Sequence, residues 1–477
     1  MIPLRLAQLA RVTGGRVGGP AGASGEPPQD VLVDGPVVTD SREAGPGGLY
    51  VARIGEHADG HRFVPQAADA GAVAALVTQP VEGLPYVLVD DVQEAFAALA
   101  THVVESIDGL VVVGITGSSG KTTTKDLLAA VLAEHAPTVA NVGSLNSEVG
   151  VPLTVCRAEP DTRFLVLEMG ARGVGHIRYL TDMTHPRVGV VLNVGSAHVG
   201  EFGSREVIAR AKAELVESLP AGGLAVLNAD DDLVTTMPVA PGARVVRTGR
   251  GPGADVRALD VALDAGGAPA FTLSLAGERV PVHLQLLGEH QVDNALAVAA
   301  VAAEAGMSAA GIGAALSAAR PASRWRMERH ERRDGVTILN DAYNANPESM
   351  SAALHTLAHI GGSRTWAVLG GMLELGPGGP QAHARMGELA RALGVDEVLA
   401  VGDLARPIAD AAAGQAGGQD PAYARTRARW VHDNQAAFEV LDAELREGDV
   451  VLLKSSRDSG LRVLGDRLST VNSEVDA

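Results

Sequence analysis

The sequence predicts an α/β protein built from three domains, and three observations support this prediction. The chain has 477 residues, which is more than a single hydrophobic core usually organises. Short apolar runs alternate with helical patterns along most of the chain, as they do in proteins with parallel sheets. Aromatic residues make up only 3% of the chain, so Ala, Val and Leu must fill the cores, which is typical of helices packed on a buried sheet.

The first domain is expected to span residues 1–108. A segment rich in Gly, Pro and Ala at 17–30 predicts a loop. Short apolar runs at 31–33 and 74–77 predict strands. Together these features favour a small α/β unit.

The second domain is expected to span residues 109–323. A continuous apolar run at 110–115 is typical of a buried parallel strand, and a Gly-rich turn at 117–120 and a helical pattern at 125–132 follow it. Alternating apolar residues between 243 and 287 predict additional antiparallel strands. This order favours a doubly wound sheet whose ligands bind at the carboxyl ends of its strands. Further strands are predicted at 164–167, 188–192 and 224–227.

The third domain is expected to span residues 324–477 and to be a second α/β unit. A surface loop is predicted at 411–421, which is rich in Gly, Gln and Ala. Strands with helices between them are predicted at 337–339, 366–369, 397–400 and 450–453.

The charge and the cysteine content narrow the class of protein. The formal net charge is −18, whereas general nucleic-acid binders are normally basic, so no nucleic-acid partner is expected. The one cysteine, Cys156, allows neither an intramolecular disulfide nor a cysteine zinc site, and we expect it to be a small buried side chain. The chain has no run of 18 apolar residues and no leader-like N-terminus, so we expect a cytoplasmic protein with no membrane insertion.

The strongest motif is the segment that follows the first strand of the second domain. A strand, a Gly-rich turn and a helix start direct backbone N–H groups at one point, where the helix dipole adds positive potential. Lys121 supplies a charge for the β- and γ-phosphates, and the Thr122 hydroxyl can bind Mg²⁺. Ile115 stands where the strict phosphate-loop pattern has its first glycine, so this is a shortened variant; the alternative is an ordinary strand-to-helix turn. The loop residues are Thr116, Gly117, Ser118, Ser119, Gly120, Lys121, Thr122 and Thr123.

Two ionisable residues follow further strands of the second domain. Glu168 follows the strand at 164–167, where Mg²⁺ would lie, or else it caps a helix. His198 comes shortly after the strand at 188–192 and should face the same cleft, unless it is a packed surface histidine. Because both strands end where ligands bind, we favour a functional role for each residue.

Three polar features leave a structural and a functional interpretation open. Lys212 lies in a helical pattern, where an ordinary lysine would pair with a nearby Glu. Asn294 could contact an adenine edge or cap the helix that begins near it. The polar segment 340–347 closes a strand of the third domain and is either a turn or part of a site.

Taken together, these segments resemble the Mur ligase family, and within it the enzymes that add D-alanyl-D-alanine. The resemblance covers essentially the whole chain. The segments that separate this type from its sister ligases are 145–152, 340–347 and 372–376. The others that carry the resemblance are 39–42, 47–52, 55–56, 59–61, the phosphate loop, 168–170, 193–198 and the helix around Lys212.

The resemblance implies an ATP-dependent ligase. ATP would phosphorylate the C-terminal carboxylate of UDP-N-acetylmuramoyl-tripeptide, and the amine of D-alanyl-D-alanine would attack the resulting acyl phosphate. The products would be UDP-N-acetylmuramoyl-pentapeptide, a peptidoglycan precursor, with ADP and phosphate. The implied fold is a small α/β N-terminal UDP-binding domain, a central P-loop-type mononucleotide-binding parallel sheet and a C-terminal Rossmann-like domain that binds the incoming dipeptide. A monomer is expected.

The resemblance also implies roles for individual residues. Thr122 and Glu168 would hold one Mg²⁺. His198 and a carbamylated Lys212 would hold a second, because carbamylation turns a cation into a carboxylate-like ligand. The implied catalytic residues are Lys121, Glu168, His198 and Lys212. Besides the phosphate loop, the implied ATP contacts are Asn294, Arg326, Asp341 and Asn344. The implied substrate contacts are Ser41 and Arg42 at the UDP end, with Asn146, Tyr343 and Asn346.

The sequence departs from the family pattern at three places. Gly371 stands where an acid usually precedes Met372. Residues 454–457 read Lys-Ser-Ser-Arg in place of the usual Lys-Gly-Ser-Arg. Trp325 stands where Gly is common.

Other classes of protein fit the sequence less well. A sister ligase that adds the third peptide residue would carry an Asp-Asn-Pro-Arg motif in its last domain, and none occurs here. A folylpolyglutamate synthetase would lack a first domain like residues 31–80, and an amidotransferase partner subunit would carry four zinc-binding cysteines. The sequence leaves open whether the third residue of the acceptor peptide is L-lysine or meso-diaminopimelate. A nucleotide-binding pseudoenzyme would not be expected to keep Lys121, Glu168, His198 and Lys212.

Overall fold

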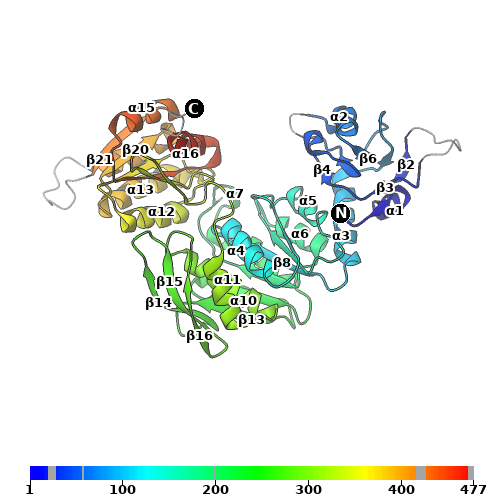
Figure 1. Ribbon diagram of the computed structural model, residues 1–477, viewed down its shortest axis with the longest axis horizontal. Helices are drawn as coiled ribbons and strands as arrows, with labels where there is room; N and C mark the ends of the chain where they lie inside the picture. The colour runs from blue at the N-terminus through cyan, green and yellow to red at the C-terminus, as the bar shows by residue number, and fades with distance from the viewer. Residues whose placement is uncertain (20–27, 56–57, 198, 415–425, 471–477) are drawn as a thin grey trace.

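The computed structural model describes residues 1–19, 28–55, 58–197, 199–414 and 426–470. It contains helices and mostly parallel sheets, so the predicted α/β class is confirmed. Figure 1 shows three lobes in chain order, with the second lobe between the first and the third. Their main sheets have five, nine and six strands respectively. Within the described ranges, no helix is long and apolar enough to cross a membrane.

The first lobe is a small α/β unit. Its elements are β1 (Leu4–Arg5), α1 (Leu6–Val12), β2 (Arg16–Gly18), β3 (Leu32–Val33), β4 (Val37–Val38), η1 (Ser41–Glu43), β5 (Gly48–Val51), η2 (Gly60–Phe63), α2 (Val64–Asp69), β6 (Ala72–Val77), β7 (Tyr86–Leu88) and α3 (Val92–Ser106). The sheet order is β2-β7-β6-β5-β4, in which only β2 is antiparallel to its neighbour. Residues 17 and 18 belong to β2, so the loop predicted at 17–30 begins later than expected, and its residues 20–27 lie outside the described ranges.

The second lobe contains the doubly wound sheet that the sequence predicts. Its elements are β8 (Val111–Thr116), α4 (Lys121–Ala133), β9 (Thr138–Ala140), α5 (Gly150–Val155), β10 (Phe164–Glu168), α6 (His176–Thr184), β11 (Val188–Val191), α7 (Val199–Phe202), α8 (Arg205–Glu217), β12 (Leu224–Asn228), α9 (Asp232–Thr235), β13 (Arg244–Gly249), β14 (Val256–Leu263), β15 (Pro269–Leu275), β16 (Glu278–His283), α10 (Gln291–Glu304) and α11 (Ala309–Ala318). The order is β16-β15-β14-β13-β12-β11-β8-β10-β9, and the predicted antiparallel addition is confirmed at β14, β15 and β16. Helices α4, α10 and α11 cover one face, and α5, α6 and α8 pack on the other.

The third lobe is a parallel sheet with helices on both faces, which agrees with a Rossmann-like domain. Its elements are β17 (Glu328–Glu331), β18 (Thr337–Asn340), α12 (Pro347–Ile360), β19 (Arg364–Leu369), η3 (Gly376–Gly378), α13 (Gly379–Ala392), β20 (Glu397–Val401), η4 (Asp403–Ala405), α14 (Arg406–Ala413), β21 (Arg427–Val431), α15 (Asn434–Glu444), β22 (Asp449–Lys454), η6 (Arg457–Ser459) and α16 (Leu461–Thr470). The order is β17-β18-β22-β19-β20-β21, with only β17 antiparallel to its neighbour. Residues 411–413 complete α14, so the loop predicted at 411–421 starts later, and residues 415–425 lie outside the described ranges.

Helix α3 joins the first lobe to the second. Asp91 caps this helix by accepting hydrogen bonds from the backbone N–H groups of Gln93 and Glu94 at 2.7 and 3.1 Å. The helix packs against α5 and α6, and one apolar cluster runs from the first sheet through α3 to the second sheet. Because α3 belongs to both cores, a domain boundary at residue 108 stays a prediction.

The topology of the second sheet places the candidate site. Strand β8 lies between β10 and β11 and pairs in parallel with both. The chain leaves β8 through α4 towards the edge strand β9, and it later returns on the opposite side of β8 at β11. Such a reversal opens a crevice at the carboxyl ends of the strands. The segments that follow β8, β10 and β11 therefore meet at one edge of the sheet.

Candidate active site

The loop between β8 and α4 is fixed by close contacts. Gly120 has a φ of +80°, and a Cβ atom there would lie 2.5 Å from the side-chain oxygen of Asn294, so a larger residue would be strained and would clash. The side-chain oxygen of Asn193 accepts hydrogen bonds from the backbone N–H groups of Ser118 and Ser119 at 3.0 and 2.9 Å. The first turn of α4 has further N–H groups without acceptors inside the helix, so the loop favours an anion at this point.

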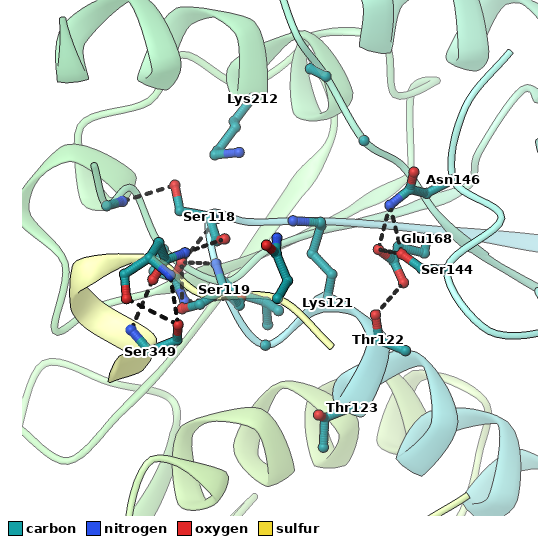
Figure 2. A pocket seen from close by; sticks show the side chains of 18 of the residues that line it. Ser118, Ser119, Lys121, Thr122, Thr123, Ser144, Asn146, Glu168, Lys212 and Ser349 are labelled. Carbon is teal, nitrogen blue, oxygen red and sulfur yellow. Dashed lines mark hydrogen bonds between the residues drawn. The ribbon is translucent and has the colours of Figure 1, made fainter. Parts of the chain in front are cut away.

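Glu168, the last residue of β10, lies beside the hydroxyl of Thr122. One carboxylate oxygen accepts a hydrogen bond from that hydroxyl at 2.8 Å. The other accepts from the side chains of Asn146 at 2.6 Å and Ser144 at 3.3 Å, and Figure 2 shows these side chains converging. Glu168 and Thr122 are both buried. Their oxygens are ligands of the kind that Mg²⁺ prefers, so the residues present fit a magnesium ion.

Two lysine side chains reach towards the loop from different elements, as Figure 2 shows. The amine of Lys121 donates a hydrogen bond to the carbonyl oxygen of Gly117 at 2.6 Å. Lys212, on α8, is only 6% exposed and has no hydrogen-bond partner among the described residues. Burial lowers the pKa of both lysines, and the charge of Lys121 lowers the pKa of Lys212 further. Pairing of Lys212 with a glutamate, the structural alternative from the sequence, is not seen within the described ranges.

The third lobe closes over the loop. The guanidinium of Arg326 donates a hydrogen bond to the hydroxyl of Thr122 at 2.9 Å. The side-chain nitrogen of Asn346 donates to the carbonyl oxygen of Ser118 at 3.3 Å. A cavity of about 1230 Å³ lies between these surfaces. The Nε atom of Arg326 is buried with no hydrogen-bond partner in the described structure, so this donor is free for a ligand.

Asp341 follows β18 and is held by two neighbours. One of its oxygens forms an ion pair with the amine of Lys454 at 2.5 Å, and the other accepts a hydrogen bond from the backbone N–H of Met327 at 3.1 Å. Lys454 also donates to the carbonyl oxygen of Asn344 at 3.2 Å. Burial lowers the pKa of Lys454, and Asp341 opposes this effect. Both members of the ion pair line the cavity.

Asn294 lies in the first turn of α10. Its amide nitrogen donates a hydrogen bond to the side chain of Gln291 at 2.8 Å. The N-cap position of α10 is His290, so the interpretation of Asn294 as a helix cap is wrong. His290 lines the same cavity, and burial lowers its pKa to about 4.

Ser41 and Arg42 lie in the first lobe and do not line this cavity. The hydroxyl of Ser41 donates to the side-chain oxygen of Gln66 at 2.7 Å, and the Nε atom of Arg42 donates to Asp40 at 2.9 Å. Hydrogen bonds from the side chain and from the backbone N–H of Arg42 lower the pKa of Asp40 to about 2. A contact with the UDP end of a substrate stays a prediction for both residues.

His198 lies outside the described residues, so its place in the site stays a prediction. Within the part of the chain that is described, no group of three or more His, Cys, Asp and Glu side chains is arranged to hold a metal ion. A protonated lysine is not a metal ligand, so a second ion near Lys212 would depend on the carbamate.

The cavity brings most of the predicted site residues together. Thr116 and Gly117 belong to the loop but do not line the cavity. The hydroxyl of Thr123 points away from Glu168 in Figure 2, although the residue lies at the cavity wall. The other predicted residues that line it are Ser118, Ser119, Gly120, Lys121, Thr122, Asn146, Glu168, Lys212, Asn294, Arg326, Asp341, Tyr343, Asn344 and Asn346.

Several cavity residues received no role from the sequence, and Asn193, His290 and Glu348 are among them. A signal for Asn193 exists, because it is the first polar residue after the apolar run at 188–192. Glu348 accepts a hydrogen bond from the backbone N–H of Ser196 at 2.8 Å, across 152 residues of sequence. An acid in the first turn of a helix is common for local reasons, so the sequence gives no sign of this contact.

The fold and the cavity define a nucleotide-dependent α/β enzyme, in which a phosphate-binding loop faces a Rossmann-like domain. Three family descriptions match the chain: "Mur ligase family, catalytic domain" at residues 36–103, "Mur ligase middle domain" at 115–302, and "Mur ligase, glutamate ligase domain" at 325–457. The chain belongs to the Mur ligase family.

Individual relatives agree with this assignment. The UDP-N-acetylmuramoyl-tripeptide–D-alanyl-D-alanine ligase of Mycobacterium tuberculosis is 46% identical over 98% of each chain. A crystal structure of MurF from Acinetobacter baumannii superposes with a TM-score of 0.86 at 30% identity and covers 98% of this chain and 99% of its own. The MurF ligase of Thermotoga maritima, solved in complex with ADP, has a TM-score of 0.76 at 28% identity over 91% and 97% of the two chains.

Proposed function

We propose that this protein is the ATP-dependent ligase that joins D-alanyl-D-alanine to UDP-N-acetylmuramoyl-tripeptide. The observation that carries the proposal is 46% identity, over 98% of both chains, to an enzyme named for this reaction. The cavity between the phosphate loop and the third lobe supports it, because both parts can contact one nucleotide. The reaction forms an amide bond and yields a peptidoglycan precursor with ADP and phosphate.

In the first step, the terminal carboxylate of the tripeptide attacks the γ-phosphorus of ATP. A bond forms between that phosphorus and a carboxylate oxygen, the bond to the β,γ-bridging oxygen breaks, and ADP leaves. Two anions approach each other, so fixed positive charge must face them. Lys121 from the loop and Arg326 from the third lobe would supply this charge.

Thr122 and Glu168 would hold a magnesium ion beside the phosphates. When bound, Mg²⁺ offsets the negative charge of the transferring group. Hydrogen bonds from Asn146 and Ser144 orient the Glu168 carboxylate beside the hydroxyl of Thr122.

In the second step, the neutral amine of the dipeptide attacks the acyl carbon. A carbon–nitrogen bond forms, the nitrogen loses a proton, and the carbon–oxygen bond to phosphate breaks as the tetrahedral intermediate collapses. Asn146 from the second lobe, with Tyr343 and Asn346 from the third, line the cavity where the two peptides would meet.

Lys212 is proposed to act as its carbamate. Burial and the neighbouring charge of Lys121 lower the pKa of Lys212, so its amine is more readily neutral and nucleophilic. The neutral amine can add to carbon dioxide, with loss of a proton, to form a carboxylate-like group. Together with His198, that group would hold a second Mg²⁺.

The remaining contacts are proposed from position in the cavity or from the family resemblance. Asn294 would contact the base, while Asp341 would contact the ribose and Asn344 would lie close by. Ser41 and Arg42 would contact the UDP end from the first lobe. The domains are proposed to span 1–108, 109–323 and 324–477, and the enzyme is proposed to act as a monomer in the cytoplasm, where ATP is supplied.

The proposal is tested by measuring phosphate release from ATP while each component is omitted in turn. We expect release only when UDP-N-acetylmuramoyl-tripeptide, D-alanyl-D-alanine and Mg²⁺ are present together, with pentapeptide formed in equal amount. Equal release of phosphate in the absence of the dipeptide would contradict the ligase proposal. Acceptors with L-lysine and with meso-diaminopimelate as third residue, compared side by side, identify the natural substrate.

A further inference from the structure

Trp325 has a backbone conformation that tryptophan rarely adopts. Its φ is +58°, in the left-handed region that favours glycine. Gly would adopt this conformation without strain, whereas a residue with a Cβ atom is strained there. The indole therefore stands at a position where the backbone conformation favours glycine.

Contacts within the third lobe hold the indole in place. Its Nε1 atom donates hydrogen bonds to the two carboxylate oxygens of Asp466, on α16, at 3.0 and 3.2 Å. The guanidinium groups of Arg324 and Arg462 lie 4.9 and 5.6 Å from the centroid of the indole. Arg324 also donates to Asp466 at 2.8 Å. The orientation of the ring is thus defined by hydrogen bonds and by cation–π contacts.

The indole in turn contacts a residue of the cavity wall. The ring of Tyr343 stacks on Trp325 with centroids 6.4 Å apart and an angle of 22° between the planes. The guanidinium of Arg326 lies 4.3 Å from the centroid of the Tyr343 ring. Tyr343 and Arg326 line the cavity, whereas Trp325 does not. The contacts therefore run from Asp466 through two aromatic rings to the arginine that reaches Thr122.

We propose that Trp325 is a positioning residue for the nucleotide site, which acts through Tyr343 to hold Arg326 towards the phosphates. This inference rests on the proposed function, because it takes Arg326 to contact the nucleotide. An arginine side chain has many rotamers, and ordering them opposes binding. A ring fixed by the indole restricts those rotamers before the nucleotide binds.

The test measures the dissociation constant of MgADP by calorimetry in variants of the full chain. W325F and W325L fill similar space and share the strain at φ +58°, but only Phe can stack on Tyr343. W325F keeps the stacking on Tyr343 but loses the hydrogen bonds to Asp466, so we expect it to bind MgADP only about twofold more weakly than the parent protein. W325L should bind about fivefold to tenfold more weakly than the parent protein. W325G relieves the backbone strain but removes the ring, so it should bind MgADP as weakly as W325L. W430F is the matched control, because Trp430 donates to the carbonyl oxygen of Gly402 away from the cavity.

A double-mutant cycle with Y343A identifies the route of the effect. If Trp325 acts through Tyr343, the losses in W325L and Y343A will not add in the double variant. Equal affinity of W325F and W325L, or additive losses, would overturn the inference while leaving the proposed function intact. A parent protein that neither binds MgADP nor forms pentapeptide would instead contradict the proposed function itself.

Discussion

The guanidinium of Arg326 donates a hydrogen bond to the hydroxyl of Thr122 at 2.9 Å, across 204 residues of sequence and between two lobes. The same hydroxyl donates to Glu168 at 2.8 Å. Thr122, itself a proposed magnesium ligand, therefore connects the third lobe to the second proposed ligand, Glu168. A nucleotide bound at the loop would contact both lobes, so binding and closure of the cavity are expected to be coupled.

Replacing Arg326 should weaken both ATP binding and phosphoryl transfer. Arg326→Ala removes a cation and the buried Nε donor that has no partner in the described structure. We expect kcat to fall about a hundredfold and the KM for ATP to rise, as for loss of one transition-state contact. Steady-state phosphate release measures both. Arg329→Ala is the control, because Arg329 is exposed and pairs locally with Glu331; a similar loss in both variants would contradict a specific role for Arg326.

Replacing Glu168 should change the dependence of the reaction on Mg²⁺. Glu168→Gln removes the charge beside Thr122 and places an amide donor next to groups that already donate to this carboxylate. We expect the Mg²⁺ concentration for half-maximal activity to rise at least about tenfold. Titration of activity with Mg²⁺ gives this value. The control is Glu159→Gln, an exposed residue of the same lobe, and an unchanged Mg²⁺ requirement in Glu168→Gln would rule out the proposed ligand role.

Replacing Lys212 should remove activity that small carboxylates can restore. Lys212→Ala leaves space where the carbamate would lie, so we expect a loss of about a hundredfold or more, with partial recovery on adding acetate or propionate. A lysine that only packs in α8 would show no such recovery. The parent protein, assayed in buffer depleted of carbon dioxide, should also gain activity when bicarbonate is added. Full activity of Lys212→Ala would refute the proposed carbamate.

His290 should make the fold less stable in mild acid. Burial lowers the pKa of His290 from 6.5 to about 4; Asp341 and Glu289 oppose this shift, and Lys454 adds to it. The unfolded chain takes up a proton below pH 6.5 while the folded chain does not, so stability falls as the pH drops from 6.5 to 4. The contribution is on the order of 3 kcal/mol.

His290→Gln removes this titration and should lose less stability than the parent between pH 7 and pH 4.5, by roughly 2 to 3 kcal/mol. Denaturant unfolding at the two pH values measures the difference, since all other groups titrate in both proteins. His355→Gln is the control at an exposed histidine. Parallel losses in His290→Gln and the parent would show that His290 does not titrate in this range.

Much of the fold follows from local patterns in the sequence. The continuous apolar runs of β8, β10 and β11 predict buried parallel strands, and the alternation of Phe271, Leu273 and Leu275 predicts the antiparallel addition. The double role of α3 could not be predicted, because an amphipathic pattern shows which face is buried but not which sheet covers it.

The candidate site likewise contains residues that the sequence predicts and contacts that it does not. The phosphate loop and Glu168 are recognisable because strand ends and glycines lie next to them in the sequence. Contacts such as Glu348 with Ser196 depend on how two lobes meet, and no local pattern encodes that. The ion pair of Asp341 with Lys454 could not be predicted either, because its members lie 113 residues apart in the sequence.

The most direct test of the proposed reaction follows the oxygen atoms of the acceptor. UDP-N-acetylmuramoyl-tripeptide is labelled with a heavy oxygen isotope at both oxygens of its terminal carboxylate and incubated with ATP, D-alanyl-D-alanine and Mg²⁺. If that carboxylate attacks ATP, one phosphate is released for each pentapeptide formed, and each phosphate carries one heavy oxygen. Release of unlabelled phosphate would contradict the account, because no acyl phosphate would then have formed.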